Sequence, residues 1–214
     1  MADQPAAEQT AFGTSETTKA TFKTVFEVGP GALEQAQGMA DTFQHAIAPA
    51  TVDFDFGELS RAASGIPDGS TVKIIRGWGL QETAPAGVMA LSLREAVRQA
   101  LTHPFGNPAF WKKAEAALAD AFVGLGEQEG KHLSFYGDAD DTTSYYYNLL
   151  FALQDEETEG FVYAVALCVD VTIALGAEKA RALTLEDVAQ YAIRLNAISV
   201  RQGLRPTAWP PAGA

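Results

Sequence analysis

Three histidines are candidates for chemistry, because an imidazole ring binds zinc and transfers protons near neutral pH. His45 falls within a predicted helix, His103 lies beside a helix end and His132 lies in a loop. No two of them have the spacing of a zinc site. The single cysteine, Cys168, allows no disulfide within the chain. The sequence therefore predicts no metal and no cofactor.

An acidic cluster offers a second possible ion site. Asp138, Asp140 and Asp141 form an acidic loop. A calcium loop of the EF-hand type needs glycine at its sixth place and glutamate at its twelfth. Thr143 and Leu149 stand at those places. We interpret the cluster as a solvated turn.

The glycines and serines indicate no catalysis. Gly124, Gly126 and Gly130 follow a predicted helix, whereas the glycines of a phosphate-binding loop precede a helix. Ser64 and Ser144 lack the G-x-S-x-G context of a nucleophilic serine. No pair of carboxylates stands out among the 27 acidic residues. We therefore expect a protein that is not an enzyme.

Composition limits the partners. The chain has 214 residues, of which 47% are hydrophobic, which is enough for one domain with a substantial core. Its formal net charge is -12 and it has no basic cluster, so we expect no nucleic-acid partner. Like charges repel anionic lipid, so lipid contact would favour zwitterionic headgroups. The N-terminus has neither the basic region nor the apolar region of a secretory signal.

Three long segments with strand periodicity dominate the C-terminal half. Average strands have about 5–6 residues, and about 9–11 tilted residues cross the hydrocarbon core of a bilayer. The predicted strands span residues 143–154, 161–175 and 181–200, the last with an interruption near 186–187. In the middle segment, large apolar residues alternate with small or polar ones such as Asp170, a period of two that predicts a strand. Two interpretations stay open, a buried central sheet and a sheet that rearranges into lipid.

The preceding chain repeats one unit, a strand followed by a pair of helices. The predicted strands and helices span residues 22–28, 32–47, 55–65, 71–82, 86–102, 107–125 and 133–136. This order predicts an α/β fold, a single-domain three-layer α-β-α sandwich in which two helix hairpins flank a mostly antiparallel sheet with long C-terminal strands. We expect residues 1–20 to be a mobile leader, residues 21–202 the folded domain and residues 203–214 a Pro-rich tail.

One segment identifies a family. The sequence SYYYNLLFALQDEET at residues 144–158 resembles the long-strand signature of the Cyt-type cytolytic δ-endotoxins of insect-killing bacteria. The segments TVFEV at residues 24–28 and AASGIP at residues 62–67 are similar to the first strand and the second helix end of that family. Phe110-Trp111 and residues 188–200 also resemble it. The resemblance extends over residues 21–202.

The resemblance implies a toxin that permeabilises membranes by binding lipid directly, without a protein receptor. It implies an inactive, often dimeric protoxin, which is made in the bacterial cytoplasm without a secretory signal, released in soluble form and trimmed at both ends by proteolysis. Membrane phospholipids and further copies of the chain are the implied partners, and the target-cell membrane is the place of action. Whether strands or helix hairpins enter the bilayer stays open, as does the choice between pores and detergent-like disruption.

If the strands insert, their backbone groups must pair within an oligomer, because lipid offers no hydrogen bonds. The large apolar face of the hairpin would then meet lipid, whereas in the soluble form it would face a helix layer. The predicted membrane-insertion residues are Tyr145, Tyr147, Leu149, Phe151, Phe161, Tyr163, Val165, Leu167, Val169, Val171 and Ile173.

The chain departs from the family in its third helix, which carries Arg94, Glu95 and Arg98 and is less apolar than is usual there. This charge argues against insertion of that helix alone. The net charge and the short tail leave an alternative function open, a non-lytic module that binds a lipid or an acyl chain on the same scaffold. An enzyme is the third alternative.

Overall fold

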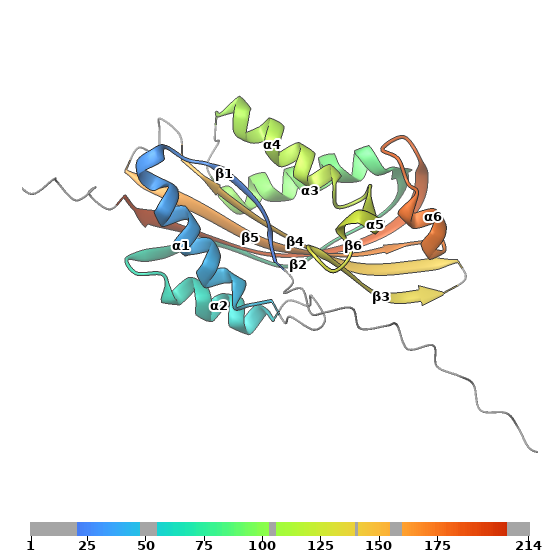
Figure 1. Cartoon of the computed structure of the whole chain (residues 1–214), viewed down its shortest axis with the longest axis horizontal. Helices are drawn as coiled ribbons and strands as arrows, with labels where there is room; N and C mark the ends of the chain where they lie inside the picture. Colours follow the sequence, from blue (N-terminus) through green and yellow to red (C-terminus); the bar gives the residue numbers. More distant parts are fainter. Residues whose placement is uncertain (1–20, 48–54, 103–105, 140, 155–159, 205–214) are drawn as a thin grey trace, which may run out of the picture.

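The computed structural model describes residues 21–47, 55–102, 106–139, 141–154 and 160–204. One sheet of six strands forms the middle of the molecule, in the order β1-β4-β5-β6-β2, with β3 beside β4 (Figure 1). The strands are β1 (Lys23–Glu27), β2 (Gly69–Pro85), β3 (Leu133–Ala139), β4 (Thr142–Leu153), β5 (Phe161–Ile173) and β6 (Val188–Gly203). The helices are α1 (Leu33–Gln44), α2 (Phe56–Gly65), α3 (Ala86–Leu101), α4 (Pro108–Ala119), α5 (Leu125–Gln128) and α6 (Ala177–Arg181), with a 3₁₀ turn at Pro30–Ala32.

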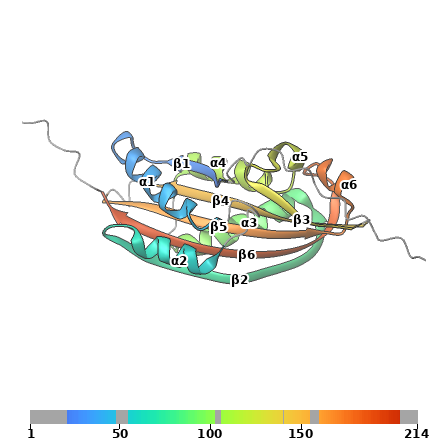
Figure 2. The same cartoon turned by 60° about the horizontal axis from the view of Figure 1, so that its bottom comes forward.

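Helices cover both faces of the sheet (Figure 2). The helices α3, α4 and α5 enclose one hydrophobic core against one face, and α1 and α2 enclose a second core against the other. In β5 the odd residues from Tyr163 to Ile173 enter the first core, and the even residues from Val162 to Cys168 enter the second. The predicted three-layer sandwich is confirmed.

Local capping fixes the start of two helices. The Asp55 carboxylate accepts hydrogen bonds from the N–H groups of Gly57 at 2.7 Å and Glu58 at 3.0 Å, which begins α2. The Asn107 side chain caps α4, and Pro108 occupies the first helical position. Free N–H groups at a helix start need such acceptors, and proline has no N–H group to satisfy. Both predicted helix starts are therefore confirmed.

The long strands pair in simple register, with one exception. The strands β4 and β5 are antiparallel and pair without a shift from Thr143–Ile173 to Leu153–Tyr163. The edge strand β2 pairs with β6 but shifts register twice, between Thr71 and Lys73 and between Ile75 and Trp78. Gly77 lies in this bulge with a φ of 65°, a left-handed conformation that costs other residues about 1–2 kcal/mol. The segment predicted at residues 71–82 is therefore one continuous strand with a bulge at Gly77.

The prediction for residues 181–200 was wrong over its first part. Arg181 ends the short helix α6, and β6 begins only at Val188. Between them, the Asp187 carboxylate accepts hydrogen bonds from both the N–H group and the hydroxyl of Thr184, each at 2.7 Å. Such a side-chain turn satisfies the backbone locally and competes with strand pairing.

Smaller differences concern element ends. The first helix ends at Gln44, before the predicted residue 47, and β3 extends to Ala139, beyond the predicted residue 136. Ordered strand structure at the C-terminal side runs to Gly203, which the sequence assigned to the tail. The predicted leader at residues 1–20 and all but the first two residues of the predicted tail lie outside the described residues.

Candidate membrane-insertion hairpin

The β4–β5 hairpin contains every residue predicted to meet lipid. Since its strands pair in unshifted register, residues that face each other across the pair share one side of the sheet. That side is the one covered by α3, α4 and α5. The residues of the predicted set that lie buried in this core are Tyr145, Tyr147, Leu149, Phe151, Tyr163, Val165, Leu167, Val169, Val171 and Ile173. This placement matches the expectation for the soluble form, and entry into lipid stays a prediction.

Phe161 is the exception within the predicted set. Its side chain is 39% exposed and lies outside the core beneath α3 and α4. The Arg201 guanidinium lies 5.1 Å from the centroid of its ring, in a cation–π contact. The hairpin therefore carries its buried apolar face up to this end and leaves its first residue of β5 at the surface.

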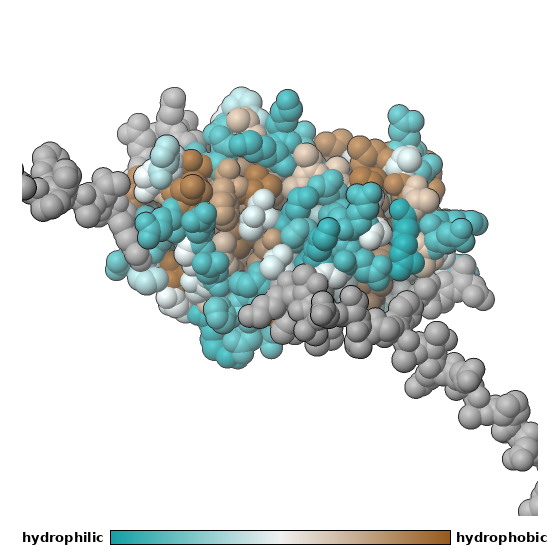
Figure 3. Space-filling view, in the orientation of Figure 1, coloured by the Kyte–Doolittle hydropathy of each residue, from teal (hydrophilic) through white to brown (hydrophobic). Residues whose placement is uncertain are grey.

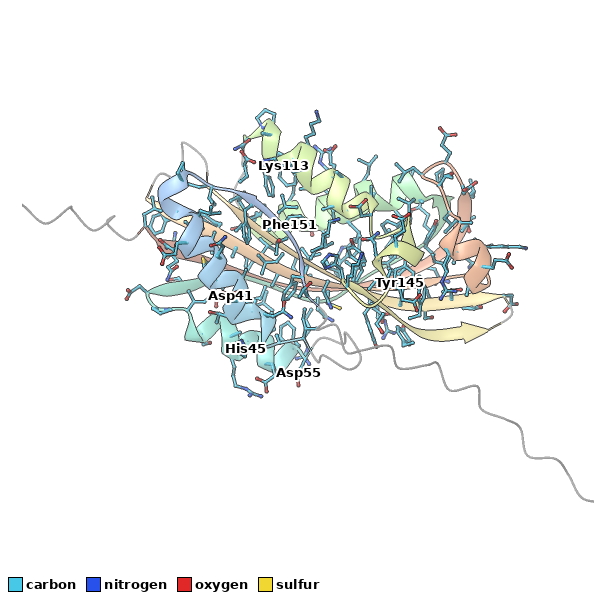
Figure 4. All side chains as sticks on the ribbon, viewed as in Figure 1. Asp41, His45, Asp55, Lys113, Tyr145 and Phe151 are labelled. Atoms are coloured by element: carbon cyan, nitrogen blue, oxygen red, sulfur yellow. The ribbon has the colours of Figure 1, made fainter. Side chains whose placement is uncertain are left out.

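Aromatic rings join the hairpin to its helix cover. Phe110 of α4 packs edge-to-face on Phe151 with ring centroids 5.9 Å apart. Phe135 of β3 packs on Tyr145 in the same manner at 5.6 Å. Figure 4 shows Tyr145 and Phe151 on the side of the sheet where α4 and α5 lie. Such contacts add about 0.5–1.5 kcal/mol each beyond the burial of area.

The buried tyrosine hydroxyls are satisfied by the segment around α5. The Tyr145 hydroxyl donates to the Ala121 carbonyl at 2.7 Å, and the Tyr147 hydroxyl donates to Gln128 Oε1 at 2.5 Å. Gln128 in turn donates to the Asp120 carbonyl at 2.6 Å. Burial raises the pKa of Tyr145 well above its usual value, so its hydroxyl remains a neutral donor. These bonds would have to break before the hairpin could leave its cover.

Polar contacts also hold α3 in place. The buried Ser199 hydroxyl of β6 donates to the Ala100 carbonyl in the last turn of α3 at 2.6 Å. Arg94 of α3 forms an ion pair with Glu115 of α4 at 2.8 Å, and its guanidinium lies 5.6 Å from the Trp111 ring. The charged side chain of Arg94 therefore joins α3 to α4 within the covering layer.

The edge strand β1 is held by two lysines. Lys23 pairs with Asp120 at 2.9 Å, beyond the C-terminal end of α4. Lys113 of α4 pairs with Glu27 at the other end of β1. Both pairs are partly exposed, and exposed ion pairs contribute at most about 1 kcal/mol. They orient β1 against α4 more than they stabilise it.

A polar row on the opposite face of the sheet was missed by sequence reasoning. Tyr146, Asp170 and Arg194 are direct neighbours across β4, β5 and β6. Two surface hollows of about 540 and 320 Å³ lie beside them. The only signal in the sequence was Asp170, a carboxylate within an otherwise apolar strand.

The histidines do not converge. His45 lies at the end of α1 (Figure 4), where its ring contacts the Asp41 carbonyl, and the His132 ring contacts the Thr21 carbonyl at 2.9 Å. His103 lies outside the described residues, as does Asp140 of the acidic cluster. Within the described part of the chain, no three His, Cys, Asp or Glu side chains are grouped so that they could hold a metal ion.

An apolar patch lies at the surface where α3 begins. Leu91 of α3 is 54% exposed and Val188 at the start of β6 is 60% exposed, with Val88 and Leu185 also exposed. The Gly87 N–H group donates to the Leu185 carbonyl at 2.9 Å, which brings the two segments together. Figure 3 shows hydrophobic surface in this region, at the upper right.

No helix in the described part of the chain combines the length and the apolar character that crossing a bilayer requires.

Sequence comparison identifies the class of protein to which this fold and this hairpin belong. A family model described as Bacillus thuringiensis toxin matches residues 7–210, and the chain belongs to this family. It is 30% identical over 190 residues to the type-2Aa cytolytic delta-endotoxin of Bacillus thuringiensis subsp. kyushuensis, a match that covers 88% of this chain and 73% of that relative. It is 29% identical to the type-2Bb cytolytic delta-endotoxin of subsp. jegathesan, over 86% of this chain and 70% of that one.

Solved structures agree with this assignment. A delta-endotoxin structure matches with a TM-score of 0.83 at 28% identity, covering 98% of this chain and 94% of that one. The crystal structure of the activated Cyt2Ba monomer from Bacillus thuringiensis subsp. israelensis matches with a TM-score of 0.82 at 27% identity, covering 87% of this chain and 100% of that one. The resemblance found in the sequence is confirmed, and the chain is a member of the cytolytic, insecticidal delta-endotoxins.

Proposed function

We propose that this toxin permeabilises membranes by binding lipid directly, after which the β4–β5 hairpin leaves its α3–α4 cover and inserts as part of an oligomer. The observation that carries the proposal is the hairpin itself. Its unshifted register places an almost unbroken apolar face on one side of both strands. The 13 residues of β5 exceed the roughly 9–11 that cross a hydrocarbon core.

Energetics explain why lipid would be needed. Each large apolar side chain loses about 1.5–3 kcal/mol when it moves from a core into water. A face that includes Tyr147, Leu149, Phe151 and Leu167 cannot open into water at that cost. Hydrocarbon removes the penalty, and pairing with hairpins of other copies satisfies the backbone. Self-association in the membrane is therefore part of the proposal.

The proposed lipid preference and the proposed activation have separate support. A net charge of -12 opposes adsorption to anionic membranes, which favours zwitterionic phospholipid. The exposed apolar patch at Leu91 and Val188 supports contact with a lipid surface. The activated Cyt2Ba monomer is matched over its whole length by 87% of this chain. We propose that proteolysis trims the remaining terminal residues of a protoxin, which is made in the bacterial cytoplasm without a secretory signal and acts at the target-cell membrane.

Dye release from phosphatidylcholine liposomes tests the proposal directly. The full chain is assayed before and after limited proteolysis, with phosphatidylglycerol liposomes as the matched control. We expect release from phosphatidylcholine, greater after proteolysis. Absence of release in both states would refute the proposal. Retention of a radiolabelled fatty acid by the protein, together with intact liposomes, would instead support the non-lytic acyl-chain-binding alternative.

A further inference from the structure

The cover that α1 and α2 give to the sheet ends partway along β5. Val162 to Cys168, the even residues of the first part of this strand, are buried beneath these helices. The next two even residues, Asp170 and Thr172, are only half-buried. At this point the sheet face becomes accessible and its side chains become polar.

Four strands bring one side chain each to a row across this face. Tyr146 of β4, Asp170 of β5 and Arg194 of β6 are direct cross-strand partners. Tyr136 of β3 stacks on Tyr146, with ring centroids 4.4 Å apart and planes 24° from parallel. The Tyr136 hydroxyl donates to Asp170 Oδ1 at 2.6 Å, which orients the carboxylate. Burial and the adjacent carboxylate raise the pKa of Tyr136 to about 12, so this donor is present at neutral pH.

Two hollows open on either side of the carboxylate and the guanidinium. The larger, of about 540 Å³, is lined by Tyr136, Asp170 and Arg194, and the smaller, of about 320 Å³, shares the last two and adds Arg76. Both volumes fall within the range of ligand pockets, about 300–1,000 Å³. The Gly77 bulge described above lines the smaller hollow, where the Gly77 N–H group donates to the Asn196 side-chain oxygen at 2.9 Å. Bulges frequently occur beside functional sites because they redirect side chains.

The opposite charges in this row are not joined in an ion pair. Asp170 and Arg194 are neighbours in register, yet neither forms an ion pair among the residues described. Arg194 is exposed, and Arg76 is engaged with the Phe56 ring at 5.0 Å. The site therefore offers an oriented carboxylate beside two tyrosine rings at one position and guanidinium groups at the next.

We propose that this row binds the phosphocholine headgroup of a bilayer lipid, with the ammonium group at Asp170 and the tyrosine rings and the phosphate at Arg194 and Arg76. Carboxylates and aromatic rings attract quaternary ammonium ions, and guanidinium groups match the geometry of phosphate oxygens. A lipid with an anionic headgroup alone would meet Asp170 unfavourably. The proposal rests on the proposed function, because it names the part of a membrane that this toxin would recognise first.

Binding to phosphatidylcholine vesicles measures the site apart from permeabilisation. The full-length protein is mixed briefly with vesicles at 4 °C, and bound protein is separated by flotation. The variants Asp170→Asn and Arg194→Gln each remove one charge from the row. Arg201→Gln is the matched control, since it removes one charge from the same strand outside the hollows and beside Phe161. Arg194 is exposed, so its variant keeps the fold.

We expect each row variant to bind about tenfold more weakly than the control, the effect of losing one charge-assisted contact. Phosphocholine should displace the natural protein at a concentration about tenfold below that needed for inorganic phosphate, and Asp170→Asn should remove that difference. Equal binding of Arg194→Gln and Arg201→Gln to the vesicles would refute the proposed headgroup site. Equal displacement of the natural protein from the vesicles by phosphocholine and by inorganic phosphate would also refute it.

Dye release separates this inference from the proposed function. If the natural protein releases dye and both row variants bind and release like the control, the headgroup site is wrong and membrane permeabilisation stands. If the variants bind weakly and the natural protein binds without release, the site stands and permeabilisation is wrong. If the natural protein does not bind phosphatidylcholine vesicles, both are wrong.

Discussion

A covalent bridge between α3 and β6 should prevent membrane permeabilisation. The substitutions Ala100→Cys and Ser199→Cys replace two small buried residues that are already joined by a hydrogen bond of 2.6 Å. This contact places residue 199 of β6 against the last turn of α3, and a disulfide joins Cα atoms about 4.4–6.8 Å apart. Cys168 is replaced by alanine in the same chain, so that the introduced thiols have no competitor.

The size of the effect follows from the separation along the chain. The two positions are 99 residues apart, and closing a loop of that size stabilises a fold by about 4.7 kcal/mol. Losing the Ser199 hydrogen bond leaves the Ala100 carbonyl without this donor and subtracts about 1–3 kcal/mol. The net gain of about 2–4 kcal/mol should raise the melting temperature by roughly 10 °C in a chain of this size. In the oxidised protein α3 cannot leave β6, so release should fall close to the background.

The assay is dye release from phosphatidylcholine vesicles by one protein sample, oxidised and then reduced with dithiothreitol. The Cys168→Ala protein without the bridge is the matched control and should respond to neither treatment. The melting temperature of the oxidised sample shows that the bridge has formed. Release by the bridged protein at the rate of the reduced protein would refute the idea that α3 must leave the sheet.

Three further predictions concern single residues. Ser199→Ala leaves the Ala100 carbonyl without the Ser199 donor, so the free energy of unfolding in urea should fall by about 1–3 kcal/mol. Dye release by this variant should become faster, because α3 is held less firmly. Leu167→Ala opens a cavity beneath the helix cover and should cost about 2–5 kcal/mol by the same measurement. Burial lowers the pKa of His132 below its usual 6.5, so the unfolded chain takes up the proton first and stability falls as the pH drops below about 6.5. His132→Gln should flatten this decline between pH 7.5 and pH 5, measured as melting temperature.

Each of these predictions has its own control. Ser92→Ala removes an exposed hydroxyl that bonds within α3, and it should change neither stability nor release. Slower release by Ser199→Ala would show that the α3 contact does not limit opening. An Ile74→Ala change at an exposed position should cost far less than Leu167→Ala. For His132, the nearby charges are Lys23, Lys131 and Asp120, and a decline that persists in His132→Gln would assign the effect to other groups.

The elements whose signals are local were predictable from sequence. The strands β4 and β5 alternate over more than ten residues, and the caps Asp55 and Asn107 determine helix starts by themselves. The segment before β6 was not predictable in this way. Leu183 and Leu185 alternate with polar neighbours as in a strand, but the bonds between Asp187 and Thr184 form a turn. Whether such a turn prevails over pairing depends on the surrounding structure, which composition does not contain.

The candidate sites differ in the same respect. The buried face of the hairpin was predicted because large apolar residues alternate with small or polar ones along one continuous segment. The row of Tyr136, Tyr146, Asp170 and Arg194 depends on the register of four strands, and a shift of one residue in any of them would turn its side chain to the other face. Sequence alone gives no such register, so only the isolated carboxylate of Asp170 marked the position.

The outer edge of β4 is shared by two short strands that approach from opposite directions. The strand β1 runs parallel to residues 149–153, and β3 runs antiparallel to residues 142–147. Neither strand covers the whole edge, so either can detach while the other remains. Amide protons in the two halves of β4 should therefore exchange with deuterium as two separate units. Proteolysis that frees β1 would expose the five β4 residues with which it pairs. A strand of another copy could pair with them there, so that assembly starts at this end of the hairpin while β3 still covers the other end.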